Sequence, residues 1–355
     1  MIRIRRGVVL EVESPRPGVL RALVEVEGEK EQAIAYPSLS GPVKSGDRVV
    51  LNTGAVALGL GTGGMHFVIA VENGTDVDPP GHVGHAMKLR YTPMQHAVEA
   101  VEETHREALD SFEGLAGTPV VVAPLHSALA PAAVAARATR PEARIAFVMT
   151  ESGALPIAFS ESVAALKAAG LLDATVTCGQ AFGGELEAVN RFSGIAAASV
   201  VANADVIVAG AGPGNLGTGS RLGHASIDIG ETINAIAALG GRPIVAPRIS
   251  FADPRERHRG ISHHTITALS VAALVGAEIA LPTLTPERRD EIVSRLEEAH
   301  LLEIHRVVDV ELGDDVESAL RTSPVRLESM GRSFDDDPDY FRAGAAAGVL
   351  AARLR

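Results

Sequence analysis

The sequence has little of several residue types, and each scarcity excludes a class of protein or site. The 355 residues contain one cysteine, Cys178, so neither an intrachain disulfide nor a cysteine-rich metal site can form. Tryptophan is absent and aromatic residues make up only 3% of the chain, so alanine, valine and leucine must fill the core. A basic excess is missing too, because the net charge is -12. Nucleic-acid binders gain affinity from lysine and arginine, so we expect neither a nucleic acid nor an anionic membrane surface as partner.

No stretch of the sequence is typical of an export signal or a membrane span. The first residues, MIRIRRGVVLEVES, alternate and carry charge, and they lack the apolar core of a secretory signal. The longest apolar stretches, such as 343–352, are too short to cross a bilayer. We therefore expect a soluble protein of the cytoplasm.

Two well-known catalytic motifs are also missing. The chain contains no G-x-x-x-x-G-K-[ST] sequence, so a P-loop is not supported, and it contains no G-x-S-x-G, so an α/β-hydrolase is not expected. What is present is the composition of a globular protein, with 46% hydrophobic and 21% charged residues.

The N-terminal residues 1–75 have the pattern of a small all-β domain. Short segments with partial alternation and β-branched residues follow one another at close spacing, which predicts a small barrel or sandwich. The next residues are rich in glycine, proline and aspartate, and we interpret 76–95 as a linker or junction segment.

The pattern changes at residue 96, and 96–355 are predicted to form an α/β domain that ends in a helix. Helices are expected over 96–112, 127–138, 160–169, 185–202, 226–239, 262–275 and 286–299. About seven strands are expected, at 119–124, 144–150, 174–179, 205–210, 242–247, 277–282 and 305–310. The strands are uniformly apolar, as strands covered by helices on both faces are. A doubly wound, mostly parallel sheet follows. The small residues at 343–348 would let the last helix pack against this domain or a second subunit, which leaves a homo-oligomer open.

The loops that follow the predicted strands are rich in glycine and polar residues, whereas the loops at the opposite ends are short and bland. Ligands of open α/β sheets bind outside the carboxyl ends of the strands. This asymmetry predicts a binding site at that edge of the sheet.

One of these loops, AGAGPGNLGTGSRLGH (209–224), contains a formal match to the dinucleotide fingerprint G-x-G-x-x-G. The three glycines of the match are Gly212, Gly214 and Gly217, and Gly219 follows them. The next helix is expected late, the following strand ends at Arg248 rather than at an acidic residue, and the motif lies in the middle of the domain. An anion-binding loop that uses backbone N–H groups is therefore favoured over NAD or NADP binding, and a plain surface loop shaped by glycine remains an alternative.

Histidines recur in the same loops or at the helix starts that follow them. His126, His224, His263 and His264, together with Glu151, are our candidates for acid, base or metal-ligand roles, and His258 lies in the same loop as the last two. No spacing among them identifies a metal. Since adjacent helical residues point in different directions, we expect at most one of His263 and His264 to face the site. Ser127 is expected to cap the helix that follows it.

Basic residues could supply the charge for an anionic ligand. Arg221 and Arg248 lie in the strand-end loops, and Lys88 and Arg90 lie in GHVGHAMKLRYTPMQHA (81–97), which concentrates positive charge in an acidic chain. A linker with solvated charges explains the last two equally well.

The order of these pieces resembles a family of bacterial conserved proteins of unknown function. The resemblance rests on the β-rich start, GHAMKLRYTPMQ, GAGPGNLGTGS and the ISHHT helix, and it covers essentially the whole chain. It implies a bacterial cytoplasmic origin and carries no activity, cofactor or functional residue with it.

Three functions stay open. The first is an enzyme of hydrolase or transferase type that acts on a small anionic, for instance phosphorylated, metabolite. The second is a non-catalytic binding or regulatory protein that uses the same pocket. The third is an NAD(P)-dependent oxidoreductase, which the imperfect fingerprint disfavours.

Overall fold

The computed structural model describes residues 2–61, 63–76 and 84–354. The chain divides into two compact units, Met1–Val98 and Glu99–Arg355. The histidine at position 82 and part of the predicted linker 76–95 fall at 77–83, outside the described residues. Within the described residues, no helix combines the length and the apolar character needed to cross a membrane.

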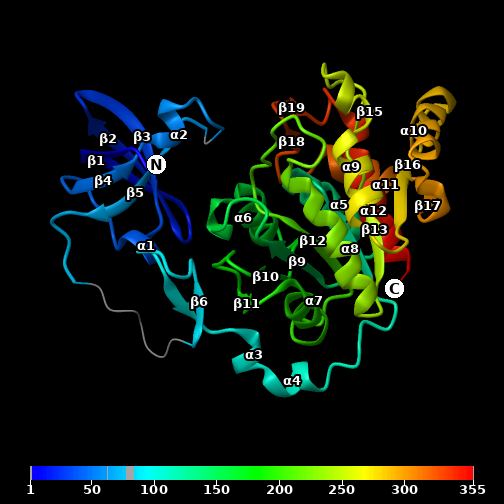
Figure 1. The fold of residues 1–355 in the computed structure, drawn as a ribbon, viewed down its shortest axis with the longest axis horizontal. Helices are drawn as coiled ribbons and strands as arrows, with labels where there is room; N and C mark the ends of the chain where they lie inside the picture. The colour runs from blue at the N-terminus through cyan, green and yellow to red at the C-terminus, as the bar shows by residue number, and fades with distance from the viewer. Residues whose placement is uncertain (1, 62, 77–83, 355) are drawn as a thin grey trace. The chain divides into compact units, whose positions relative to one another are not determined.

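The first unit contains a closed five-stranded barrel, so the expected small all-β domain is confirmed as a barrel (Figure 1). Its strands, in the order in which they pair around the barrel, are β1 (Ile4–Arg16), β2 (Val19–Val26), β3 (Glu29–Ala35), β5 (His66–Val71) and β4 (Arg48–Asn52). The partial alternation of the sequence arises because every second side chain points into the barrel, where Val24, Val49 and Leu51 are buried. Glu27 and Gly28 join β2 to β3, and both have positive φ, as a two-residue hairpin turn requires.

Short elements complete the first unit. They are α1 (Pro37–Ser40), α2 (Gly54–Ala57) and the hairpin of β6 (Ala86–Lys88) with β7 (His96–Val98). The helix predicted over 96–112 is therefore wrong as a single element. Its start is β7, and the rest forms α3 (Val101–Thr104) and α4 (Arg106–Asp110), separated at His105, whose backbone leaves the helical region with φ -128° and ψ 35°.

The second unit is built on one eight-stranded parallel sheet. The strands, in spatial order, are β11 (Leu186–Ala188), β10 (Ala174–Cys178), β9 (Ile145–Thr150), β12 (Val206–Ala211), β8 (Pro119–Ala123), β13 (Arg242–Val245), β16 (Glu278–Pro282) and β17 (Arg306–Val310). All seven predicted strands are present. β11 is added at one edge, inside the segment 185–202 for which only a helix was predicted.

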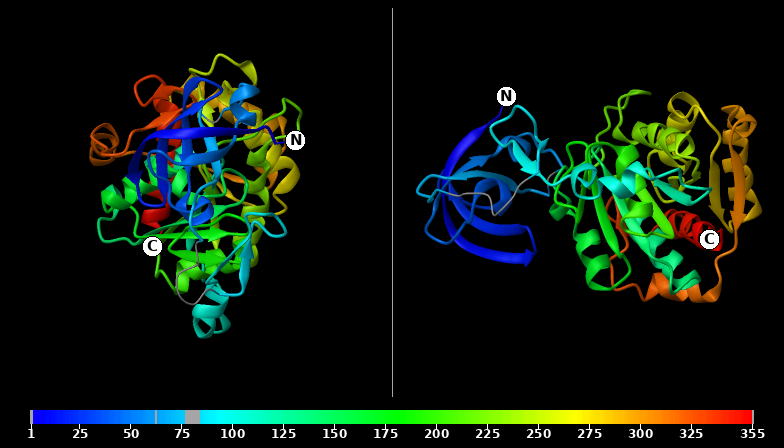
Figure 2. Two further views of the ribbon diagram at one scale, coloured as in Figure 1. Left: turned by 90° about the vertical axis from the view of Figure 1, so that its left-hand side faces the viewer. Right: turned by 90° about the horizontal axis from the view of Figure 1, so that it is seen from below.

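Helices cover both faces of this sheet, which can be followed in Figures 1 and 2. One face carries α5 (Leu129–Thr139), α6 (Glu161–Ala168), α11 (Asp314–Arg321) and α12 (Pro338–Arg353). The other carries α7 (Arg191–Val200), α8 (Asp228–Ala238), α9 (His263–Thr267), which continues as a π turn over Ala268–Ala272, and α10 (Pro286–Glu298). This explains why the strand sequences are uniformly apolar, because β8, β9 and β10 are buried along their whole length.

The C-terminal helix α12 packs against α5. A Cβ atom at Gly348 would lie 2.1 Å from the carbonyl oxygen of Ala132, and one at Gly344 would lie 2.8 Å from Pro131. The small residues that the sequence concentrates here are therefore required by a close helix–helix contact within the unit.

The strand order creates a switch point between β12 and β8. The connection from β8 leaves over the face of α5, and the connection from β12 leaves over the face of α8. Adjacent strands whose connections diverge in this way leave a crevice at their carboxyl ends, where open α/β sheets bind ligands. Figure 1 shows α9, β15 (Gly260–Ile261) and the pair of β18 (Glu328–Ser329) with β19 (Arg332–Ser333) gathered at this end of the unit.

Candidate functional site

A pocket of about 260 Å³ lies at the switch point between β8 and β12. It is lined by the loop after β8 (124–127), Ser162, the start of the glycine loop (211–215) and residues 328–330. Its polar lining residues include Ser127, Ser162, Ser329, Asn215, His126 and Glu328, so it can hydrogen-bond a small polar molecule.

The start of the glycine loop packs closely against the backbone of Ala154. A Cβ atom at Gly212 would lie 2.3 Å from the carbonyl oxygen of Ala154, whose own N–H donates to the Pro213 carbonyl oxygen over 2.8 Å. Gly214 and Gly219 adopt positive φ, and Gly217 lies against the ring of His264. Helix α8 begins only at Asp228, after a 3-10 turn over Ala225–Ile227, so no helix N-terminus follows the glycines directly.

His126 lines the pocket and has both ring nitrogens occupied. Its Nδ1 lies 3.0 Å from the carbonyl oxygen of Ala211, which can only accept, so Nδ1 carries the proton. Its Nε2 lies 2.6 Å from the Ser160 hydroxyl, which then donates to it. Burial lowers the pKa of His126 to about 4, so this ring is neutral at physiological pH.

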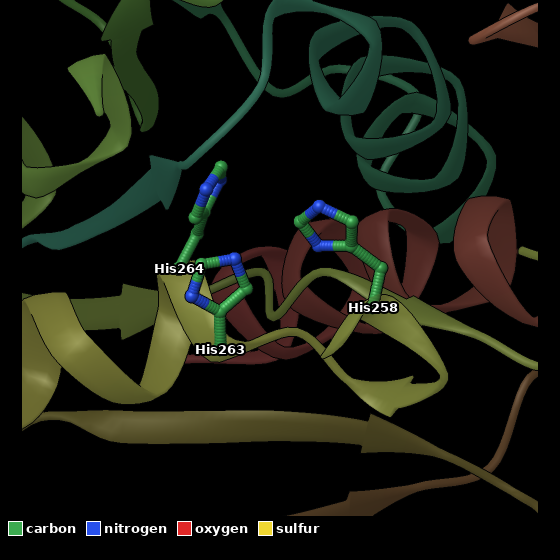
Figure 3. Close-up of side chains that lie close together, drawn as sticks. All are labelled: His258, His263 and His264. Atoms are coloured by element: carbon green, nitrogen blue, oxygen red, sulfur yellow. The ribbon is translucent and has the colours of Figure 1, made fainter. Parts of the chain in front are cut away.

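Four other histidines form a cluster at the start of α9, which we call the histidine cluster: His224, His258, His263 and His264. The rings of His224 and His264 are stacked with centroids 4.0 Å apart, and those of His263 and His264 are 4.3 Å apart. One nitrogen each from His258, His263 and His264 lies within 4.8 Å of the other two (Figure 3). Our expectation that only one of His263 and His264 would face the site is wrong, because both rings turn toward His258 from neighbouring backbone positions.

The nitrogens of the histidine cluster differ from those of His126 in their hydrogen bonds. Several buried ring nitrogens have no hydrogen-bond partner within the described part of the chain. They are Nε2 of His263, Nδ1 of His264 and both ring nitrogens of His224. The backbone of Arg221 lies near His224 but outside the distance and angle of a hydrogen bond. His258 is held, because its Nδ1 lies 2.8 Å from the hydroxyl of Ser262.

The rings of the cluster are neutral at physiological pH. Burial, followed by the positive charges of Arg248 and Arg255, lowers the pKa of His258 to about 3. Burial and the neighbouring imidazoles lower the pKa of His264 to about 3, and burial also lowers the pKa values of His224 and His263.

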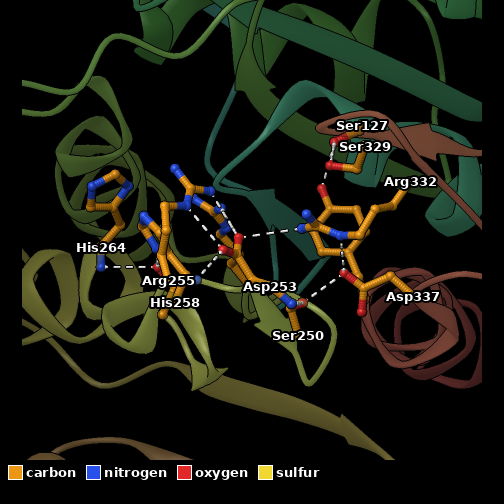
Figure 4. Close-up of polar contacts among 12 residues, drawn as sticks. Ser127, Ser250, Asp253, Arg255, His258, His264, Ser329, Arg332 and Asp337 are labelled. Carbon is orange, nitrogen blue, oxygen red and sulfur yellow. Dashed lines mark hydrogen bonds and ion pairs between the residues drawn. The ribbon is translucent and has the colours of Figure 1, made fainter.

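Next to the histidine cluster lies a network of three arginines and two aspartates (Figure 4). The fully buried carboxylate of Asp253 pairs with Arg255 at 2.8 Å and with Arg248 and Arg332 at 3.3 Å. Arg332 also pairs with Asp337 at 3.0 Å. Burial raises the pKa of Asp253, but the hydrogen bonds and charge of Arg255 outweigh it and hold that pKa well below its usual range. Three cations against two anions leave one positive charge in excess.

The network reaches the pocket through hydroxyl groups. The Ser127 hydroxyl lies 2.6 Å from Tyr340 and 2.9 Å from Ser329, and Tyr340 lies within electrostatic range of Arg248. The expectation that Ser127 caps α5 is wrong, because its hydroxyl makes these long-range bonds and no side chain caps that helix. Ser262 caps α9.

The remaining predicted residues lie apart from these contacts or in the other unit. The carboxylate of Glu151 accepts a hydrogen bond of 2.6 Å from the backbone of Gln180. Arg221 is exposed on the glycine loop. Lys88, which is buried, and Arg90 belong to the first unit. Arg248 is buried within the network described above.

Several residues of this edge were not singled out in the sequence. They are Arg255, Ser329, Arg332, Asp337 as an ion-pair partner, and Tyr340. The polar loop SFADPRERH signals the first of them. The other four come from the C-terminal segment, which no local pattern connects with the sheet edge.

Comparison with known families places the chain in one whose function is not established. The family model DUF3866, described as a protein of unknown function, matches residues 32–348, and the chain belongs to this family. Searches of curated proteins and of solved structures found no match.

Proposed function

We propose that the protein is an enzyme of hydrolase or transferase type that acts on a small anionic metabolite, for instance a phosphorylated one, in the cytoplasm of a bacterium. The ligand would bind at the carboxyl edge of the eight-stranded sheet. The observation that carries the proposal is the meeting of a switch-point pocket, an arginine network with excess positive charge and a cluster of neutral imidazoles at that edge.

The arginines supply the reason for an anionic ligand. The side chain of Arg255 is 40% exposed while its partner Asp253 is fully buried, so part of the Arg255 guanidinium remains available to a ligand. A guanidinium binds phosphate and carboxylate oxygens with two parallel hydrogen bonds. The pocket adds the hydroxyls of Ser127 and Ser329 and backbone N–H groups.

The imidazoles supply the reason for chemistry. A neutral imidazole with a free nitrogen can accept a proton from water or from a substrate hydroxyl. We assign an acid–base or metal-ligand role to His224, His263 and His264. His126 is given a positioning role in the pocket wall, because both of its nitrogens are already hydrogen-bonded.

Thermal denaturation in the presence of anions tests the binding half of this proposal. Inorganic phosphate, pyrophosphate and citrate are the probes, since a ligand that binds only the folded state raises its melting temperature. We expect at least one of them to stabilise the wild type and to lose most of that effect in Arg255→Gln. The matched control is Arg259→Gln, an exposed arginine of the same loop, which should respond like the wild type.

Turnover of a panel of phosphate and carboxylate esters tests the catalytic half. Hydrolysis that falls in His224→Gln and not in Arg259→Gln supports an enzyme. Stabilisation by an anion without turnover of any ester would favour the non-catalytic binding protein. Stabilisation by NAD or NADP alone would favour the oxidoreductase.

A further inference from the structure

We propose that His258, His263 and His264 form a binding site for one divalent transition-metal ion of the zinc type, with a fourth position open to water or an anion. This metal site does not depend on the proposed activity.

Geometry provides the first argument. One nitrogen from each of the three rings lies within 4.8 Å of the other two. Zinc bound at about 2.0–2.1 Å in a tetrahedron holds its ligand nitrogens about 3.3 Å apart. Small side-chain rotations therefore suffice to close the three rings on an ion, and Figure 3 shows them converging from one loop and the first turn of α9.

The missing hydrogen bonds provide the second argument. His264 is 7% exposed, and its buried Nδ1 has no partner within the described part of the chain; the same holds for Nε2 of His263. An unsatisfied buried polar atom destabilises the folded state, so several of them together call for a ligand. A metal ion accepts nitrogen lone pairs, so it can satisfy these ring nitrogens without a proton.

Ser262 provides the third argument, because it prepares His258 for coordination. Imidazole ligands normally hold their second nitrogen in a hydrogen bond, which fixes the ring and its tautomer. The Nδ1 of His258 is held in this way by the Ser262 hydroxyl, and Nε2 is left for an ion. The same serine caps α9, so one residue positions both parts of the site.

The chemistry of the donors selects the ion. Three imidazoles suit zinc, copper, nickel or iron rather than magnesium or calcium, which prefer oxygen. Three protein ligands with an open position are typical of catalytic rather than structural zinc. His224 stacks on His264 outside this triad, where it can hydrogen-bond whatever fills the fourth position.

The charges around the triad favour an anion in that position. Arg248, Arg255 and Arg257 all place positive charge near His263, and the carboxylate of Asp253 pairs with the first two. A divalent ion adds two positive charges to this setting. Hydroxide or an anionic ligand on the metal would balance them.

The experiment is a metal titration of the full-length protein after removal of bound metal with a chelator. Zinc, cobalt and nickel are added singly, and stoichiometry, affinity and melting temperature are measured. We expect one zinc per chain and a higher melting temperature. His264→Gln and the more exposed His263→Gln should each weaken zinc binding about 100-fold or more, since even positioning residues of such sites contribute 10–100-fold. His105→Gln, a surface histidine, should bind zinc like the wild type.

Two results would overturn the proposal: no zinc, cobalt or nickel binding by the folded wild type, or wild-type zinc affinity in both cluster variants. Circular dichroism establishes that each variant is folded, and His263→Gln serves if His264→Gln is not. Zinc binding without any anion effect would refute only the proposed function, and anion stabilisation without zinc binding would refute only the metal site.

Discussion

Two histidine environments at the same sheet edge differ in how their polar atoms are satisfied. His126 is partly buried beside the pocket with one hydrogen bond to each ring nitrogen, whereas the histidine cluster has several buried nitrogens without a partner among the described residues. Burial lowers the pKa in both places, so both sets of rings are neutral. The difference teaches that burial alone does not distinguish the two environments, whereas several unpartnered nitrogens gathered in one place call for a ligand.

Substitution by leucine gives the largest contrast between the two environments. His126→Leu removes the donor to the Ala211 carbonyl oxygen and the acceptor of the Ser160 hydroxyl proton, and the free energy of unfolding should fall by about 4 kcal/mol, at 1–3 kcal/mol for each of the two groups. His264→Leu in metal-free protein removes an unpaired nitrogen and should change stability by less than about 1 kcal/mol. Urea denaturation measures both; equal losses would remove the contrast.

The pH dependence of stability should contain a contribution from His126 that its substitution removes. Its pKa is about 4 in the folded state against 6.5 for the free side chain, so between these values the unfolded chain binds more protons. Stability therefore falls as the pH drops from 6.5 to 4, and His126 contributes about 3 kcal/mol of that fall at 1.36 kcal/mol per pH unit. His126→Gln should show a correspondingly smaller fall in urea titrations across this range. The same fall in both proteins would show that His126 is not buried neutral.

The two serines that hold these rings give a smaller effect. Ser160 donates to His126 and caps α6, and Ser262 contacts His258 and caps α9. Replacing either by alanine should cost about 2 kcal/mol, since a lost cap alone costs about 1. Only Ser262→Ala should also weaken zinc affinity, by about 10–100-fold. Weakened zinc binding in Ser160→Ala would contradict the separation of the two environments.

The fold was largely predictable from the sequence, and the pattern of the misses has a physical cause. Strands such as β8 and β9 are apolar throughout because helices bury both faces, and this signal is local. The three-residue edge strand β11 has too short a pattern to be seen, and the 96–112 segment carries helical periodicity although its backbone breaks at His105.

The edge of the sheet that carries the site was also predictable, because the carboxyl ends of parallel strands must share it. The partners within the site were not. Ser127 bonds Ser329 and Tyr340, which are 202 and 213 residues away in the chain, and no local pattern contains such contacts. Which of the strand-end histidines would converge, and which would be satisfied individually, likewise depends on tertiary packing.

The most direct test of the central claim is zinc stoichiometry measured side by side in wild type, His126→Gln and His264→Gln after chelation, near neutral pH. The account predicts one zinc in the wild type, one in His126→Gln and none at comparable affinity in His264→Gln. Wild-type zinc binding in His264→Gln, or its loss in folded His126→Gln, would contradict the account.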